Sequence, residues 1–405
     1  MRNIARKPGG TRLATATSFV ALGLLAAFAV HAQAKNETLV SSQPDLIDSE
    51  ISQSRGMITW SDYSGGLWIA GIDHETGMFV PADGKGLLID PSAMATADLQ
   101  VVGNGPEWVS TVTGDQIVYS KFLADMPHTI DNARLAMAAQ SGEGDWSFGY
   151  LAPYTRRNGP YASHDPGDPA PRISYVDARG NHYWRNLFDA SSETAVPQFP
   201  RSRLSMRFVE GARAAVFAAP VDGIPQVFLL WLDSATPTQV TADGGSKDLH
   251  TVPWSWRAPE FDGDFVIATV ADDTELRIYR RHAGARGEDA TWELVRSLRT
   301  PRNGVINSPE PFVHDGKSYV VFSASWPPGT YPTAIYIASV DPAAPSLVQL
   351  TPDLPRRIRR DPEVFVASDG PYIYYNRLTM EGGGYCLSCN EGVFRTHTGL
   401  PPAQQ

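Results

Sequence analysis

SPEPFVHDGKSYVVFS, residues 308–323, predicts two β-strands joined by a tight turn. The Val, Phe and Tyr residues favour extended backbone, and Asp315-Gly316 favours the turn between them. Two more apolar runs follow at 334–340 and 347–351, separated by stretches rich in Pro, Gly and Asp. Residues 308–351 therefore predict one sheet of four antiparallel strands.

The Pro-Glu pair at the start of this unit occurs four times, as Pro106-Glu107, Pro259-Glu260, Pro309-Glu310 and Pro362-Glu363. Glu260, Glu310 and Glu363 follow one another at steps of 50 and 53 residues, and Glu107 lies 153 residues, or three steps of 51, before Glu260. A constant period of about 50 residues indicates a repeat architecture. Four strands per repeat and few helical patterns predict an all-β fold, a β-propeller of four-stranded antiparallel blades.

Seven blades fit the length best. Six is the alternative, if the weakly patterned segment 159–200 is an insertion. The last unit begins at Glu363 and runs out of chain before a fourth strand. We expect Thr38-Leu39-Val40-Ser41 to supply that strand, because pairing the first and last strands closes the ring and hides two sheet edges.

Residues 1–34 predict a signal peptide. Basic residues come first, an apolar run covers about 19–30, and Ala32-Gln33-Ala34 offers the small-x-small pattern of a cleavage site. The run is short for a membrane span, although a retained N-terminal anchor is the alternative. Residues 35–405 would then be a single propeller domain, secreted or periplasmic, with no membrane span after cleavage.

The chain carries a net charge of −10. Such a surface disfavours nucleic acid as a partner and suits a cation or a basic protein. Its two cysteines, Cys386 and Cys389, predict a disulfide that pins a hairpin turn, since export allows such bonds.

The candidate site follows from the repeat. The first strand of each blade lines the central channel, so Glu107, Glu260, Glu310 and Glu363 are expected near one rim as ligand-binding residues. Such a ring would have raised pKa values or would be neutralised by arginines or a cation, for which calcium is possible. The structural alternative is that each carboxylate accepts hydrogen bonds from a neighbouring blade.

Two tryptophans, Trp254 and Trp326, lie in loops near blade openings. They could stack on sugar rings of a glycan ligand. The alternative is that they pack between blades, as large aromatic residues do in many folds.

Gln239-Val240-Thr241, Gly244-Gly245 and Pro253-Trp254-Ser255 resemble the repeat of TolB-type propellers, and Leu350-Thr351 repeats the strand end. The resemblance implies a binding platform for a protein, glycan or ion, without catalysis. The family's Ser-Pro-Asp-Gly turn is not intact in this chain.

Arg360-Asp361-Pro362-Glu363, followed by Tyr372-Ile373-Tyr374-Tyr375, resembles a blade opening of family 43 glycoside hydrolases. That resemblance implies a secreted enzyme acting on arabinose- or xylose-containing polysaccharide. The catalytic candidates are Glu310 as acid and Asp361 or Glu363 as base.

Overall fold

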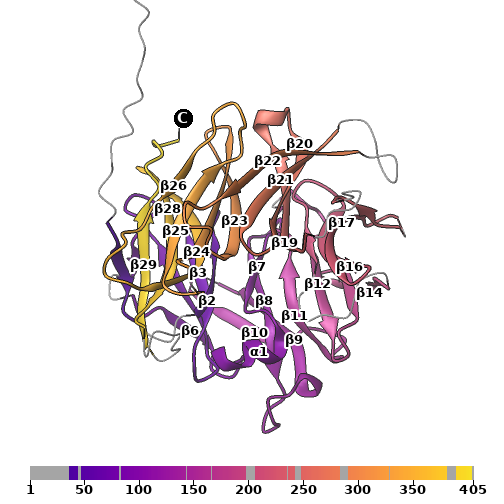
Figure 1. Ribbon diagram of the computed structural model, residues 1–405. Coiled ribbons are helices and arrows are strands. Elements are labelled where there is room, and N and C mark those ends of the chain that lie inside the picture. Colours follow the sequence, from indigo (N-terminus) through magenta and orange to yellow (C-terminus); the bar gives the residue numbers. More distant parts are fainter. Residues whose placement is uncertain are drawn as a thin grey trace, which may run out of the picture. The chain divides into compact units, whose positions relative to one another are not determined.

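Seven antiparallel sheets, each built mainly from four short strands, make up the fold (Figure 1). The computed structural model describes residues 36–403 except 44–46, 82–83, 143, 166, 198–205, 235, 242–247, 283–290, 328 and 381–388. The predicted all-β propeller with seven blades is confirmed.

Blades 1 to 3 come first along the chain. Blade 1 consists of β2 (Ile47–Ser52), β3 (Met57–Ser61), β4 (Leu67–Ile72) and β5 (Phe79–Val80), with β6 (Leu87–Asp90) also pairing with β4. Blade 2 consists of β7 (Glu107–Val109), β8 (Gln116–Phe122), β9 (Ala133–Gln140) and β10 (Trp146–Tyr150). Blade 3 consists of β11 (Arg157–Ala162), β12 (Arg172–Asp177), β13 (His182–Asn186) and β14 (Asp189–Ala195).

Blades 4 to 6 follow the same order. Blade 4 consists of β15 (Arg207–Phe208), β16 (Ala214–Val221), β17 (Ile224–Trp231) and β18 (Thr238–Gln239). Blade 5 consists of β19 (His250–Ala258), β20 (Asp264–Ala271), β21 (Glu275–Arg281) and β22 (Trp292–Arg299). Blade 6 consists of β23 (Ile306–His314), β24 (Lys317–Ser325), β25 (Thr333–Ser339) and β26 (Leu347–Gln349).

Blade 7 joins the two ends of the described chain. It consists of β27 (Ile358–Ala367), β28 (Gly370–Leu378), β29 (Asn390–His397) and β1 (Thr38–Ser41). Figure 1 shows the indigo N-terminal strand beside the yellow β29, and Thr38 pairs with Arg395 in that ladder. The predicted closure by Thr38–Ser41 is therefore confirmed.

Helical structure is confined to short turns in the described residues. They are α1 (Leu99–Val102) and the 3-10 turns η1 (Thr96–Asp98), η2 (Ile130–Asn132) and η3 (Pro259–Phe261).

The core is divided among the blade interfaces. Each of the seven pairs of neighbouring blades shares one buried apolar cluster. Between blades 7 and 1, for example, Trp60 and Phe365 are fully buried together. Large aromatic residues fill the space where twisted sheets face each other, and burying each one stabilises the fold by about 2–3 kcal/mol.

The first strands of the blades, β2, β7, β11, β15, β19, β23 and β27, are the innermost. Each contacts the innermost strand on either side, so the seven form a closed ring around the centre. One expectation is corrected here: Pro259-Glu260 does not open blade 5. The innermost strand β19 ends at Ala258, and Glu260 lies in η3, the turn that follows it.

Candidate functional site: the central channel

Each innermost strand contributes one side chain to the centre of the propeller. These side chains, called the ring residues below, line two cavities that lie on either side of them. In blade order the ring residues are Glu50, Glu107, Tyr161, Arg207, Trp254, Glu310 and Glu363. The two cavities and the ring between them form a central channel.

A local distortion of the innermost strand aims these side chains inward. In blades 1, 3, 5, 6 and 7 the pairing register breaks immediately before the ring residue. The residue two positions earlier has a positive φ; at Ser308 and Asp361 it is 45° and 49°. Such β-bulges bend a strand and redirect the next side chain.

Proline accompanies this bulge in four of the five blades. It directly precedes the ring residue as Pro106, Pro160, Pro253, Pro309 and Pro362. Pro106 lies just before β7, whose pairing has no register break, and the bulge of blade 1 has Ser49 at this position. Proline has no N–H to donate to a ladder, so a broken register is a position where it fits. The repeated feature is therefore a proline followed by the ring residue, and the identity of that ring residue varies among blades.

The two cavities differ in chemistry. The cavity of about 620 Å³, here called the polar cavity, is lined beyond the ring by Asp48, Asn104, Ser308, Arg360 and Asp361, among others. The cavity of about 440 Å³, here called the apolar cavity, is lined by Ile51, Val209, Phe312, Val364 and Val366, with His164 and Glu210 beside them. The channel thus has one polar and one apolar half.

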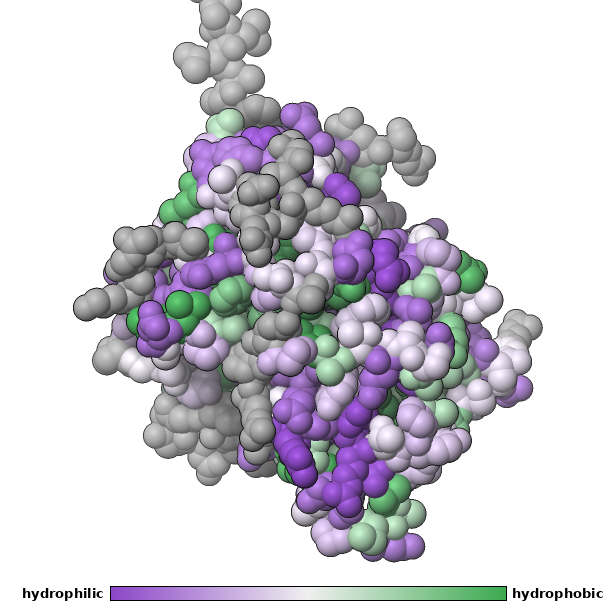
Figure 2. All heavy atoms as spheres, turned by 90° about the vertical axis from the view of Figure 1, so that its right-hand side faces the viewer, coloured by the Kyte–Doolittle hydropathy of each residue, from purple (hydrophilic) through white to green (hydrophobic). Residues whose placement is uncertain are grey.

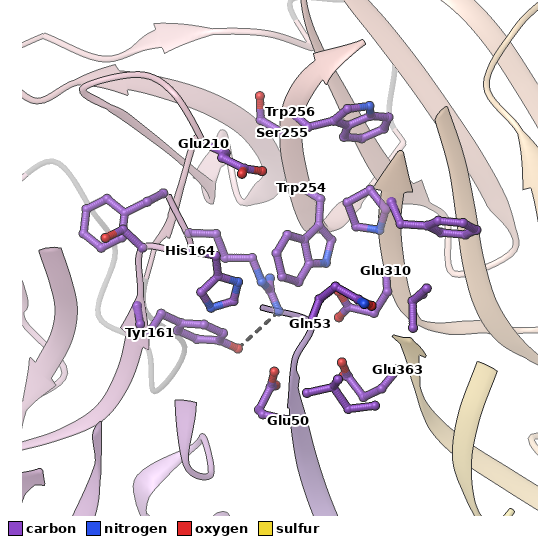
Figure 3. A pocket seen from close by; sticks show the side chains of 18 of the residues that line it. Glu50, Gln53, Tyr161, His164, Glu210, Trp254, Ser255, Trp256, Glu310 and Glu363 are labelled. Atoms are coloured by element: carbon purple, nitrogen blue, oxygen red, sulfur yellow. Dashed lines mark hydrogen bonds between the residues drawn. The ribbon is translucent and has the colours of Figure 1, made fainter. Parts of the chain in front are cut away.

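Four carboxylates occupy one continuous arc of the ring. Blades 6, 7, 1 and 2 supply Glu310, Glu363, Glu50 and Glu107 in that order, and we call these four residues the acidic arc. In the close view of Figure 3, Glu50, Glu310 and Glu363 lie together on one side of the apolar cavity.

Burial raises the pKa of Glu50 well above its ordinary value, and repulsion from Glu363 and Glu107 raises it further. The pKa of Glu363 is raised in the same way by burial and then by Glu310. Burial also raises the pKa of Glu310, although Arg207 opposes the rise. Without a positive partner, Glu50, Glu310 and Glu363 therefore keep their protons to higher pH than an exposed glutamate does.

The remaining arc is aromatic and cationic. The guanidinium of Arg207 lies 4.7 Å from the ring centroid of Tyr161 and 4.5 Å from that of Trp254. Its Nη2 also donates a hydrogen bond of 3.2 Å to the Tyr161 hydroxyl, drawn dashed in Figure 3. Stacking between two aromatic rings fixes this arginine as the cation that faces the acidic arc.

Two aspartates extend the negative charge into the polar cavity. Burial raises the pKa of Asp48 to about 7, and repulsion from Asp361 and Glu107 adds to the rise. Asp361 accepts a hydrogen bond of 3.0 Å from the Ser308 hydroxyl. The Nη2 of Arg360 lies 3.7 Å from its other oxygen.

Glu107 is held more firmly than the rest of the arc. Its Oε1 accepts a hydrogen bond of 2.6 Å from Asn104, and its Oε2 lies 3.7 Å from Nε2 of His164. Burial opposes protonation of His164, but the hydrogen bond and charge of Glu107, with Glu210 adding to them, raise its pKa overall.

The structure brings together most of the predicted site residues. Glu107, Glu310, Glu363 and Trp254 are ring residues, and Asp361 lines the polar cavity. Which of them bind a ligand, or catalyse, stays a prediction.

Two predicted site residues lie elsewhere. Glu260 accepts hydrogen bonds of 3.0 and 2.8 Å from the backbone N and the Oγ of Ser318 in blade 6. It therefore matches the structural alternative, a bond between blades. Trp326 packs against the cluster between blades 5 and 6, with the guanidinium of Arg302 4.1 Å from its ring centroid. Neither residue is among the described residues that line the two cavities.

Other expectations fall on residues outside the described ranges. Residues 1–34, the predicted signal peptide, lie there, and so does Cys386 of the predicted Cys386–Cys389 disulfide. No helix among the described residues is long and apolar enough to cross a membrane. Nor do the described His, Cys, Asp and Glu side chains form a group of three that could hold a metal ion. Calcium binding stays a prediction.

Three ring residues were missed from the sequence: Glu50, Tyr161 and Arg207. A usable signal existed for Tyr161, because Pro160-Tyr161 repeats the Pro-x pair of the other blades. Glu50 and Arg207 follow Ser49 and Met206, so the sequence pattern around them does not mark them.

Comparisons with known proteins identify the fold. No protein-family model and no curated protein matches the chain. Among solved structures, the β-propeller domain of Cps50 (Swd1) from Myceliophteria thermophila has a TM-score of 0.50 at 10% identity, covering 89% of this chain and 98% of that one.

Two further solved structures are similar at lower TM-scores. TolB from Acinetobacter baumannii has a TM-score of 0.41 at 14% identity, covering 85% of this chain and 80% of that one. The α-L-arabinofuranosidase PaAbf62A from Podospora anserina, solved with cellotriose, has a TM-score of 0.40 at 11% identity, covering 76% and 95%. TolB structures, the family of the predicted resemblance, are thus among the matches.

Proposed function

We propose that this protein is an exported, TolB-like β-propeller that acts as a binding platform, and that its ligand site is the central channel. The observation that carries the proposal is the ring itself, where seven blades place four glutamates, an arginine, a tyrosine and a tryptophan around one axis between two cavities. A concave site with a few converging polar groups is the usual form of a ligand pocket. The ligand is a protein segment, a glycan or an ion, and export implies a secreted or periplasmic location.

Three glutamates of the ring differ from a structural carboxylate of the same protein, and this difference supports binding over a purely structural role. Glu260 is an example of a structural carboxylate in this fold, because both of its oxygens accept hydrogen bonds from Ser318 across a blade interface. Glu50, Glu310 and Glu363 instead line open volume and have raised pKa values. Perturbed carboxyls that face a cavity are typical of functional sites.

Glycoside hydrolysis is the second candidate. Glu310 has the raised pKa that a general acid needs, and it lines the polar cavity together with Asp361. The arc of four carboxylates favours binding, because hydrolysis needs one acid and one base of differing ionisation.

One experiment separates the two candidates. Purified protein is applied to arrays of glycans and peptides and incubated with arabinan and xylan oligosaccharides, in parallel with Glu310→Gln and Trp254→Ala. We expect binding without sugar release, weakened in both variants. Release of sugar that disappears in Glu310→Gln would establish the hydrolase, and binding unchanged in both variants would place the ligand outside the channel.

A further inference from the structure

Building on the proposed function, we propose that the channel takes a ligand with a cationic amine and an apolar body. The amine would lie at the acidic arc, and the body would occupy the apolar cavity. The same chemistry is available in a free amine and in a lysine side chain of a partner protein.

The acidic arc supplies the first part of the argument. Its four carboxylates face only one cation among the ring residues, Arg207, which is held on the opposite side by Tyr161 and Trp254. Glu107 is buried and the other three are half-buried, and carboxylates withdrawn from water are costly unless a positive group pairs with them. An amine that enters the centre of the channel would supply that charge and stabilise the ionised arc.

The apolar cavity supplies the second part. Ile51, Phe312, Val364 and Val366 line it next to Glu50 and Glu363, so apolar wall and carboxylates adjoin. Its volume of about 440 Å³ exceeds what a metal ion or a small inorganic cation would fill. An aromatic or aliphatic body attached to the amine would exclude water from this space.

Two polar groups on β19 supply an independent observation. Ser255 is 5% exposed and lines the apolar cavity, yet its hydroxyl has no hydrogen-bond partner among the described residues. The indole N–H of the adjacent Trp254 is likewise buried without a partner in the described part of the chain. Native proteins satisfy nearly all such buried groups with protein, water or ligand, so these two groups are available to whatever fills the cavity.

The charges that face this cavity do not oppose the proposal. His164 and Glu210 are the titratable residues of its wall outside the ring, and each offsets the charge of the other. In the polar cavity, Asp48, Asp273 and Asp361 add negative charge, and Arg359 and Arg360 add positive charge. The polar cavity therefore brings its own cations, whereas Arg207 is the one cation among the ring residues.

The test uses three probes of similar shape: phenethylamine, phenethyl alcohol and 3-phenylpropionate, titrated calorimetrically into the full mature protein at pH 7. We expect only the amine to bind. Glu50→Gln and Glu363→Gln should each weaken it by about tenfold, since removing one partner of a buried charge pair costs at least that much. Glu293→Gln, an exposed carboxylate on β22, serves as the matched control and should leave affinity unchanged.

A second variant tests the apolar body. Val366→Thr keeps the side-chain shape and adds a hydroxyl to the cavity wall, so it should weaken phenethylamine several-fold and leave ethylamine unchanged. A peptide with one lysine between apolar residues, compared with its acetyl-lysine form, tests a protein as the source of the amine. Binding of either the free amine or the lysine peptide supports the inference.

Equal binding of the alcohol and the amine would overturn the cationic class and keep the channel as a site. Absence of binding by every probe would also overturn the inference. In that case a glycan found on the arrays, lost in Trp254→Ala, would leave the proposed function standing.

Discussion

Glu37 and Arg359 form a buried ion pair across 322 residues of chain, with 2.7 Å between Oε1 of Glu37 and Nε of Arg359. Glu37 directly precedes β1, and Arg359 lies on the innermost strand β27, so the pair fastens the N-terminal strand to blade 7. Tyr375 adds a hydrogen bond of 2.9 Å to the same carboxylate. The ring of blades is thus closed by the ladder between β1 and β29 and by this ion pair.

Replacing Glu37 with Gln should lower the free energy of unfolding by about 3 kcal/mol, because it leaves the fully buried guanidinium of Arg359 without its counter-charge. Urea denaturation measures this change. Glu293→Gln, exposed on β22, should change stability by less than about 0.5 kcal/mol. Equal stability of the two variants would show that the Glu37–Arg359 ion pair does not stabilise the closed ring.

The same pair has a defined pH dependence. Burial alone would raise the pKa of Glu37, but hydrogen bonding and attraction from Arg359 outweigh it and lower the pKa. A carboxyl with a lowered pKa stabilises the fold above its unfolded value and loses that effect as pH falls through the folded value. The stability difference between Glu37→Gln and the native chain should therefore shrink under acid conditions.

The contribution of Asp48 to stability should have the opposite pH dependence. Its pKa is raised from 3.8 to about 7, so the folded state binds a proton that the unfolded chain has already lost. Its contribution is favourable below pH 4 and is lost as pH rises toward 7. Asp48→Asn, which also tolerates the φ of 56° at this position, should raise stability at pH 8 by roughly 1–2 kcal/mol.

The check is a series of urea denaturations from pH 4 to pH 8 on both proteins. The advantage of Asp48→Asn should grow across this range. A constant difference would mean that Asp48 does not titrate within it.

Glu260→Gln should lower stability without affecting ligand binding, unlike a substitution of a carboxylate in the channel. It weakens the bonds to Ser318 and should cost about 1 kcal/mol in urea denaturation. Affinity for any channel ligand should not change, in contrast with Glu363→Gln. Loss of ligand binding in Glu260→Gln without loss of stability would contradict this division.

Arg207→Met should raise the pKa of Glu310 further, because Arg207 is the group that opposes the effect of burial there. Carboxyl NMR titration measures the shift. Arg257→Met removes another arginine stacked on an aromatic ring, Phe265 at 4.3 Å, but on an exposed part of β19. This control should leave Glu310 unchanged.

The sequence predicts the architecture well because blades are local units. Strands 334–340 and 318–323 and the turn at Asp315-Gly316 are encoded by neighbours in the chain, and the structure has them as β25 and β24. Closure by Thr38–Ser41 was also predictable, since blade 7 lacks a fourth strand of its own.

The site was predicted only in part. The Pro-Glu pairs identified Glu107, Glu310 and Glu363, but the same pair occurs at Glu260 in a turn. In blade 5 the bulge lies between Thr251 and Trp254, so Pro253-Trp254 supplies the ring residue and Pro259-Glu260 lies beyond the end of β19. Arg207 could not be placed at all, because its role arises from Tyr161 and Trp254 on the neighbouring blades.

On one face of the molecule (Figure 2), the described residues form no large apolar patch that would compete with the channel as a binding site. Figure 2 shows, on the coloured part of one face, hydrophobic residues scattered among hydrophilic ones. Single exposed apolar residues are normal on soluble proteins, whereas a contiguous patch would indicate docking. The channel therefore remains the better candidate than this face.

The decisive measurement is a carboxyl NMR titration of the native protein from pH 3 to pH 10, repeated on Glu50→Gln, Glu310→Gln and Glu363→Gln. If the acidic arc shares one channel, the three carboxyls titrate above the usual range. Glu310→Gln then lowers the pKa of Glu50 and of Glu363, and Glu363→Gln lowers the pKa of Glu50. Carboxyls that titrate near their ordinary values, and that do not respond to one another's removal, would show that no such shared site exists.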